Sequence, residues 1–329
     1  MYLVTGATGN VGAHIVTSLL TMGTAVRATS RNPATAALPA GTDIVPATTG
    51  AETFAGVRAI FLNPAAVHDR AEEFLHQAAS AGVRRIVVLS SSSVLDDHPA
   101  NYTGILHRDL EQHVAATGLE WTFLRAGMFA ANTRQWATAI RSEGVVRAAH
   151  GHVPIAPLHE RDLAAAAVRA LTSDDLLATA PVLTGPELRT PAEQAHLIGR
   201  AIGSDIRFEE VDPATGRELM IAQGLPPRIA ESLLRYYEHA LAEPIHPTPS
   251  LPITTTRHRV VIDTGSTTTP PTSGPRRFRH FHRGLRAPPL GDVGPPPHHR
   301  VRLSRAAGSN AAAAATTTMT AAIATKAWL

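Results

Sequence analysis

The chain alternates between short apolar runs and longer stretches in which apolar residues recur at helical spacing. The runs 57–62 and 85–89 are apolar at most positions, as expected of strands that are buried on both faces of a parallel sheet. The segment 69–81 instead places its apolar residues on one helix face and ends at Gly82, a common helix C-cap residue. Strands that alternate with helices at this spacing predict an α/β protein with a doubly wound, mostly parallel sheet.

The expected strands cover residues 2–4, 24–29, 43–46, 57–62, 85–89 and 120–125, with a late strand and turn at 182–186. The expected helices cover 11–22, 69–81, 105–117 and 161–171, with further helices from 190, around 219 and over 229–241. Ligands of such sheets bind at the carboxyl ends of the strands. That edge collects residues 6–12, Arg31, the pair 63–64 and the serines 90–93, and their convergence predicts one ligand-binding crevice.

The segment from Tyr2 to Gly12 combines an apolar strand, a glycine turn and the start of a helix. Gly6 and Gly9 allow a tight turn whose backbone can approach a ligand, and Gly12 allows the helix to pack against the strand. The N–H groups and dipole at a helix start suit a pyrophosphate. The alternative is an ordinary strand–turn–helix corner, but this context favours a dinucleotide. The predicted contacts are Gly6, Thr8, Gly9, Asn10, Val11 and Gly12.

The second predicted strand is followed by Ser30 and Arg31, beside the expected position of the adenosine ribose. An acidic residue there would bind a ribose 2′-hydroxyl and favour NAD, and the sequence has none at this point. A hydroxyl and a guanidinium match a 2′-phosphate through charge-assisted hydrogen bonds. We therefore expect Ser30 and Arg31 to make NADP(H) the preferred cofactor over NAD(H). The alternative is an exposed loop arginine without a ligand.

Two further strand ends complete the predicted site. Asn63 and Pro64 stop the fourth strand, and four serines, beginning with Ser90 and Ser91, follow the fifth. We expect these four named residues to contact the cofactor, and the serine hydroxyls suit hydrogen bonds to the nicotinamide side or to an acceptor carbonyl. The alternative is a polar loop at a strand end. The serines lack the Gly-x-Ser-x-Gly surroundings of a hydrolase nucleophile.

Composition narrows the function classes further. The 329 residues include no cysteine, which excludes disulfides, thiolate metal sites and cysteine nucleophiles. His150-Gly151-His152 and His298-His299 lack the spacing and carboxylate company of a zinc site, so no metal is expected. No apolar run reaches the roughly 20 residues that span a bilayer, and no signal peptide is recognisable. We expect a cytoplasmic protein without membrane contact.

Charge is divided unevenly along the chain. Residues 1–250 hold 19 Arg, no Lys and 25 acidic residues, whereas residues 251–329 hold 11 basic and two acidic ones. A mildly acidic body does not suggest specific nucleic-acid binding. From about His246 the sequence is rich in Pro, Thr, Arg and Ala, which predicts a disordered tail over 246–329 that could bind phosphate backbones non-specifically. A frameshift near residues 246–256 is an alternative explanation of this change in composition. Translating the DNA in the other two reading frames tests that hypothesis.

These residues resemble the NmrA-like group of atypical short-chain dehydrogenase/reductases, especially its bacterial NAD(P)H-binding, quinone- or azo-reductase-like members. The resemblance covers residues 1 to about 244 and rests on the stretches 4–12, 30–33, 107–111, 118–129, 161–164 and 183–187 and on Asn132. It implies a Rossmann-type NAD(P)-binding core over 1–130. A smaller C-terminal α/β lobe over 131–245, with elements that return to the core, would close over a substrate cleft. The usual ligand of the group is NADPH.

The chain departs from this family at the catalytic pair. Typical members use Tyr-x-x-x-Lys, in which the lysine lowers the pKa of the tyrosine, but Thr103 and His107 stand at those positions and the only lysine is Lys326. Tyr102 lies beside the expected place without a lysine partner. Ala126 also replaces a proline, and the Gly-Asp-x-x-Asp pattern is missing around residues 42–49.

Two functions fit these residues. The first is an NADPH-dependent oxidoreductase that delivers hydride to a quinone-like or other electrophilic small-molecule acceptor, for which a full acid–base pair is dispensable. His107 is then the candidate proton donor or nicotinamide-side contact, because imidazole titrates near neutral pH; the alternative is a histidine on the helix surface. The second function is a non-catalytic NAD(P)-binding redox sensor that acts through a regulatory protein partner, which the missing catalytic pair favours.

Overall fold

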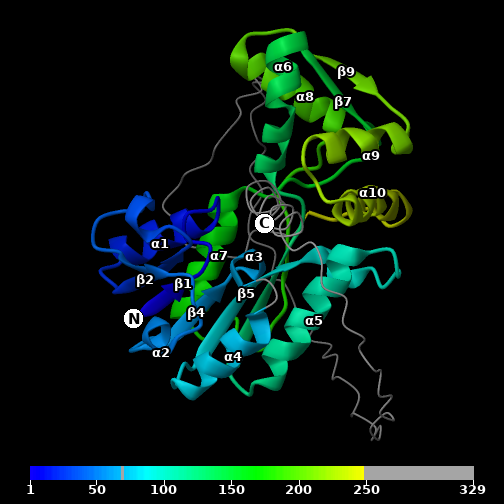
Figure 1. Ribbon diagram of the computed structural model, residues 1–329. Helices are drawn as coiled ribbons and strands as arrows, with labels where there is room; N and C mark the ends of the chain where they lie inside the picture. Colours follow the sequence, from blue (N-terminus) through cyan, green and yellow to red (C-terminus); the bar gives the residue numbers. More distant parts are fainter. Residues whose placement is uncertain (68–69, 248–329) are drawn as a thin grey trace, which may run out of the picture. The chain divides into compact units, whose positions relative to one another are not determined.

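The computed structural model describes residues 1–67 and 70–247 (Figure 1). Apart from residues 246 and 247, the predicted tail and the proposed frameshift region therefore fall outside the described residues, as do His298 and His299. In chain order the strands are β1 (Tyr2–Val4), β2 (Val26–Ser30), β3 (Asp43–Pro46), β4 (Ala59–Leu62), β5 (Arg85–Ser91), β6 (Glu120–Ala126), β7 (Val145–Ala148), β8 (Val182–Leu183) and β9 (Arg207–Glu210).

The α-helices are α1 (Gly12–Thr21), α2 (Ala51–Phe54), α3 (Pro64–Val67), α4 (Ala71–Ser80), α5 (Tyr102–Ala116), α6 (Ala137–Glu143), α7 (Glu160–Thr172), α8 (Pro191–Ile202), α9 (Pro213–Ala222) and α10 (Pro227–Ala242). Short 3₁₀ turns are η1 (Pro33–Thr35), η3 (Ser92–Leu95) and η4 (Ala130–Trp136). No helix within the described ranges is long and apolar enough to cross a bilayer.

Seven strands form one sheet in the order β3-β2-β1-β4-β5-β6-β8, and every neighbouring pair is parallel. Chain order reverses between β1 and β4, where Val4 pairs with Phe61. The prediction of a doubly wound, mostly parallel sheet is confirmed. A reversal of this kind leaves a crevice at the carboxyl ends of the two strands, which is where such sheets bind ligands.

Successive strand residues alternate between two buried cores, one on each face of the sheet. Val4, Phe61 and Val87 pack with α1 and α7, whereas Leu3 and Ile60 pack with α4 and α5. Figure 1 shows α1 and α7 on one side of the strands and α4 and α5 on the other. Because both faces are covered, the strands are apolar at nearly every position, which is the pattern that made them recognisable.

A second, two-stranded parallel sheet pairs β7 with β9 and was not predicted. Its small core joins Trp136, Val146, Ala195 and Ile206. The four residues of β7 are too few to give a clear pattern, and their partner strand lies about sixty residues later (Val145 pairs with Arg207). Between them, α7 and β8 return to the large sheet. The boundary of the C-terminal lobe at residue 131 stays a prediction.

Side-chain caps decide where two helices begin. The Asn101 side chain accepts a hydrogen bond from the Gly104 N–H, so α5 begins at Tyr102, three residues before the expected start. Thr190 and Glu193 form a reciprocal capping box ahead of α8, as the predicted N-cap requires.

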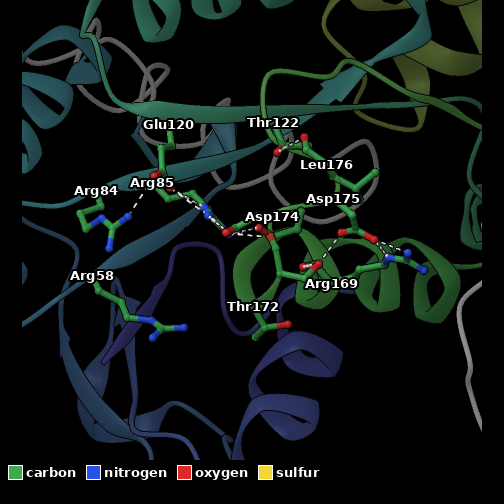
Figure 2. A network of polar contacts seen from close by, with 12 residues as sticks. Arg58, Arg84, Arg85, Glu120, Thr122, Arg169, Thr172, Asp174, Asp175 and Leu176 are labelled. Atoms are coloured by element: carbon green, nitrogen blue, oxygen red, sulfur yellow. Dashed lines mark hydrogen bonds and ion pairs between the residues drawn. The ribbon is translucent and has the colours of Figure 1, made fainter.

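A network of polar contacts fastens the amino-terminal edge of the sheet (Figure 2). The buried Arg85 guanidinium donates to Glu120 Oε2 at 2.9 Å and to Asp174 Oδ1 at 2.5 Å. It also donates to the carbonyls of Ala170, at 3.1 Å, and Ser173, at 2.7 Å, at the end of α7. The guanidinium thus joins the starts of β5 and β6 to the helix behind them, at the edge opposite the predicted crevice.

Candidate functional site

The glycine turn has the backbone that the sequence predicts. Gly6 has φ +62°, in the left-handed region that favours glycine, and the Gly9 N–H donates to the Gly6 carbonyl at 2.9 Å. A Cβ on Gly12 would lie 2.3 Å from that same carbonyl oxygen and 2.7 Å from Ala7 Cα. Helix α1 therefore begins in direct contact with the turn, and only glycine fits at position 12.

The end of β4 lies against this turn. The Thr5 hydroxyl donates to the Phe61 carbonyl at 3.0 Å and accepts the Asn63 N–H at 2.7 Å. The Asn63 side chain accepts from the Ala65 N–H at 3.0 Å, and a Cβ on Gly6 would meet Asn63 Nδ2 at 2.6 Å. The structure brings the predicted segments 6–12 and 63–64 together at the reversal of strand order.

Arg134, from the 3₁₀ turn η4, adds a positive charge that the sequence did not indicate. Its Nη1 donates to Asn10 Oδ1 at 3.2 Å. Thus a guanidinium reaches the glycine turn from a segment about 120 residues away, on the side where the helix dipole of α1 favours an anion. A residue in an irregular turn offers no periodic signal by which the sequence could identify it.

The predicted ribose contacts differ in their environment. Ser30 is buried and its hydroxyl accepts the Asn32 N–H at 3.1 Å. Arg31 is exposed, and its guanidinium makes no hydrogen bond or ion pair with residues 1–67 or 70–247. Such an exposed cation can bind an anion directly, because no ion pair with another residue has to be broken first.

Ser90 belongs to a buried polar network at the carboxyl ends of β5 and β6. Its hydroxyl donates to Glu111 Oε1 at 2.6 Å, and Arg125 binds both oxygens of the same carboxylate, at 3.0 and 2.6 Å. A buried carboxylate is stable only with such partners, and here they leave it fully engaged. The network positions the strand ends, and the role of Ser90 and Ser91 as cofactor contacts stays a prediction. Both Glu111 and Arg125 fall in stretches on which the resemblance rests.

His107 is buried at 7% exposure, so the alternative of a histidine on the helix surface is wrong. Burial lowers the pKa of its imidazole to about 4, and the nearby Glu111 only partly opposes that shift. The ring is therefore neutral at neutral pH. Its Nδ1 has no hydrogen-bond partner among the described residues, and the side chain does not line the cavity described next. Its proposed role as proton donor or nicotinamide-side contact stays a prediction.

A cavity of about 220 Å³ opens beyond the serine-rich end of β5. Its lining comes from η3, from the loop before α5, from the end of β8 and from α10; it includes Ser92, Ser93, Leu95, Asp96, Asn101, Thr184, Ser232, Tyr236, His239 and Glu243. The α10 residues Ser232, Tyr236 and His239 follow one another at intervals of four and three, so they form a single stripe on that helix, and Glu243 lies just beyond its end. This polar stripe could have been noticed in the sequence, but only a tertiary structure shows that it faces the strand ends.

Metal ligands are not gathered in the part of the chain that the structure describes: no cluster of three or more His, Cys, Asp or Glu side chains occurs there. His150 stacks on Tyr237 with ring centroids 5.9 Å apart, and His152 lies 3.1 Å from Glu210. These two histidines of the His-Gly-His segment thus have separate protein partners.

Comparison with known proteins agrees with this geometry. The family model described as NAD(P)H-binding matches residues 6–174. A reductase of (4-alkanoyl-5-oxo-2,5-dihydrofuran-3-yl)methyl phosphate from Streptomyces griseus is 37% identical over 247 residues, which are 72% of this chain and 86% of that protein. An NAD(P)H azoreductase from Xenophilus azovorans is 28% identical over 254 residues, 74% of this chain and 88% of that one.

Among solved structures, the fold is similar to that of an NADPH-dependent quinone oxidoreductase from Escherichia coli. The TM-score is 0.62 at 27% identity, covering 72% of this chain and 87% of that chain. The same enzyme in complex with NADPH gives a TM-score of 0.61.

Proposed function

The chain belongs to the NAD(P)H-binding family and is an NAD(P)H-dependent oxidoreductase, and on this premise we propose that it prefers NADPH and reduces a conjugated, electron-poor small molecule. By their names, these relatives reduce a quinone, an azo compound or an unsaturated lactone phosphate. These compounds share a π system that accepts hydride and carries the electron pair to an electronegative atom. The relatives are named as reductases, so the missing Tyr–Lys pair no longer favours a non-catalytic sensor.

The preference for NADPH is supported by Arg31 and Ser30. An NADPH 2′-phosphate at the end of β2 would meet a guanidinium that is exposed and lacks a partner among the described residues. NADH offers a hydroxyl at the same place, for which the segment supplies no carboxylate. Bidentate guanidinium–phosphate pairing distinguishes the two cofactors by charge as well as by shape.

For the cofactor itself, the residues present fit a dinucleotide. The glycine turn leaves no Cβ between its backbone and a ligand, the start of α1 presents N–H groups, and Arg134 adds a positive charge at Asn10. When bound, the nicotinamide supplies the hydride. We place its reactive end at the carboxyl ends of β5 and β6, which continue the same edge of the sheet beyond β1 and β4.

The observation that carries the proposal of a small-molecule acceptor is the cavity of about 220 Å³ at that edge. Its apolar side chains are Leu95, Val182, Pro244 and Ile245, and its polar groups include Ser92, Tyr236 and His239. A cavity in which apolar side chains and polar groups converge is typical of a small-molecule site. It adjoins the serine-rich strand end where we place the nicotinamide.

The test is oxidation of NADPH and of NADH by the purified protein with a benzoquinone, menadione, an azo dye, an unsaturated lactone and a saturated ketone. We expect turnover of the conjugated acceptors and little of the ketone. Absence of NADPH oxidation with every conjugated acceptor would overturn the proposal.

Arg31→Gln tests the cofactor preference. It should raise the KM for NADPH about 10-fold, because an exposed charge-assisted hydrogen bond contributes on the order of 1.5 kcal/mol. The KM for NADH should not change, since NADH lacks the 2′-phosphate. Arg200→Gln, at an exposed position in the last turn of α8, is the matched control and should change neither value. Equal effects of Arg31→Gln on both cofactors would contradict the assignment of the 2′-phosphate to this residue.

A further inference from the structure

Helix α10 is fixed in rotation by two polar contacts, one with the start of α5 and one with the end of η3. The Ser232 hydroxyl accepts the Thr103 N–H at 3.1 Å, at the start of α5. One turn further along α10, Arg235 Nε lies 3.2 Å from Asp96 Oδ2, just after the serine segment. Figure 1 shows α10 beside α5. These contacts fix which face of α10 meets the cavity.

That face presents Tyr236, whose hydroxyl reaches the carboxyl end of β6. A Cβ built on Gly127, the residue after β6, would lie 3.6 Å from the Tyr236 oxygen. Ser92 and the backbone of Met128 face the same oxygen and act on its pKa as hydrogen-bond donors would. The phenol therefore lies between the ends of β5 and β6, where the cavity meets the predicted nicotinamide side.

Ser92 is the second hydroxyl at this point. Its Oγ is buried and makes no hydrogen bond of normal geometry with the described residues, although it faces Tyr236. A buried hydroxyl without a full partner is costly unless a ligand completes its hydrogen bonds. Both groups line the cavity.

We propose that Tyr236 is the proton donor of the reaction: its hydroxyl, together with that of Ser92, binds the carbonyl oxygen of the acceptor and protonates it. This inference rests on the proposed function, because it assigns a role in the reduction of a carbonyl-bearing conjugated acceptor. It assigns to Tyr236 on α10 the role that the family's tyrosine has on α5.

The reaction needs no reactant besides the acceptor, NADPH and one proton from water. Hydride from the cofactor forms a new bond to the acceptor, and an electron pair moves onto the carbonyl oxygen. The O–H bond of Tyr236 breaks as a new O–H bond forms on that oxygen. The phenolate, stabilised by Ser92 and the Met128 backbone, regains a proton from water at the cavity mouth. In sum, acceptor, NADPH and a solvent proton become reduced acceptor and NADP⁺.

Burial raises the pKa of Tyr236 above its ordinary value, despite the opposing effect of Ser92 and Met128. The phenol is therefore protonated at neutral pH and needs no lysine to remain a donor. His107 is neutral and does not line the cavity. His239 does line it, but it lies one turn further along α10, 3.9 Å from Glu243. Tyr236 lines the cavity and also places its hydroxyl beside Gly127, Ser92 and Met128 at the ends of both strands.

The test compares Tyr236→Phe with Tyr237→Phe. The neighbouring Tyr237 stacks on His150 and is absent from the described lining of the cavity, so it controls for loss of a tyrosine hydroxyl from α10. With a benzoquinone and saturating NADPH, Tyr236→Phe should lower kcat about 100-fold, the usual contribution of a general acid. The KM for NADPH and the melting temperature should stay close to wild type. Ser92→Ala should lower kcat about 10-fold.

Two readouts separate proton donation from a structural role. Increasing concentrations of imidazolium buffer should raise kcat of Tyr236→Phe and leave wild type unchanged, since a small acid replaces the missing donor. Titration of menadione into the NADP⁺ complex needs no turnover and should show about 10-fold weaker binding to Tyr236→Phe.

Unchanged kcat and menadione affinity in Tyr236→Phe would overturn the inference, as would loss of activity confined to His239→Gln. A wild-type protein that reduces no acceptor would instead overturn the proposed function. In that case the menadione titration still decides whether Tyr236 binds a carbonyl oxygen.

Discussion

Replacing Gly12 with alanine tests the cofactor site at its tightest point. The added methyl would lie 2.3 Å from the Gly6 carbonyl oxygen, whereas an ordinary contact needs at least 3.4 Å. The nearest atoms are backbone, so no side chain can rotate away, and the Gly6–Ala7 turn must move by about 1 Å relative to α1. The substitution therefore changes the backbone that we expect to hold the pyrophosphate.

Two opposing effects set the change in stability that Gly12→Ala causes. Alanine is the better helix former by about 1 kcal/mol, which partly offsets overpacking of ~1–3 kcal/mol. The net loss of stability is then small, and the melting temperature should fall by only a few degrees. Binding is affected more, because an N–H···O hydrogen bond lengthened by about 1 Å is lost. Loss of one charge-assisted bond of ~1.5–3 kcal/mol weakens NADPH binding about 10- to 100-fold.

The assay is titration of NADPH by fluorescence, beside thermal unfolding of the free protein. Gly23→Ala is the matched control at the other end of the same helix: Gly23 has φ +72° and open space around its Cβ position. Left-handed strain should lower its stability by ~1 kcal/mol and leave NADPH affinity unchanged. If Gly12→Ala binds NADPH as tightly as wild type, the turn does not hold the pyrophosphate.

Two further predictions concern stability. Arg85→Met removes the guanidinium donor of Asp174 and of two carbonyls in the Figure 2 network, whereas Glu120 keeps its bond from Arg84. Because Asp174 is mostly exposed, we expect a loss of about 2 kcal/mol in stability and about 5 °C in melting temperature; a loss of NADPH affinity would contradict the separation of this network from the cofactor site. Burial would raise the pKa of Asp96, but hydrogen bonds from His98 and Arg235 outweigh it and hold the pKa below its usual range. The stability that the folded protein gains from this lowered pKa is complete above about pH 4 and is lost as pH falls further. The melting temperatures of wild type and Asp96→Asn should therefore converge below that pH, and a difference that stays constant with pH would refute this prediction.

Local patterns in the sequence predicted the structure correctly where contacts between residues close in the chain determine a segment's conformation. Strand β3 has the predicted bounds, 43–46, and α1 differs from its predicted range by one residue at each end. The prediction of one crevice also agrees with the contact between Gly6 and Asn63, because parallel strands bring their carboxyl ends to one edge. Residues that follow a buried strand could therefore be placed without a structure.

The features of the site that the sequence did not predict depend on contacts between segments that are distant in the chain. Arg134 reaches Asn10 across 124 positions, and Ser232 accepts from Thr103 across 129. Neither pair belongs to a repeating pattern, and η4 is irregular. His107 shows the same limit: the sequence places it on α5, but only the packing of that helix decides whether its face is buried and its imidazole neutral.

The missing lysine has a physical consequence for where the proton donor can lie. A Tyr–Lys pair on α5 lowers the pKa of its tyrosine by charge, so the tyrosine can exchange protons in both directions near neutral pH. A buried phenol without that charge, such as Tyr236, keeps a raised pKa and is suited to donation toward a basic oxyanion. Reduction of a conjugated acceptor creates such an oxyanion, whereas oxidation of an alcohol needs a base. At neutral pH the proposed site therefore holds the protonated donor that reduction needs, and the base for the reverse reaction forms only at higher pH.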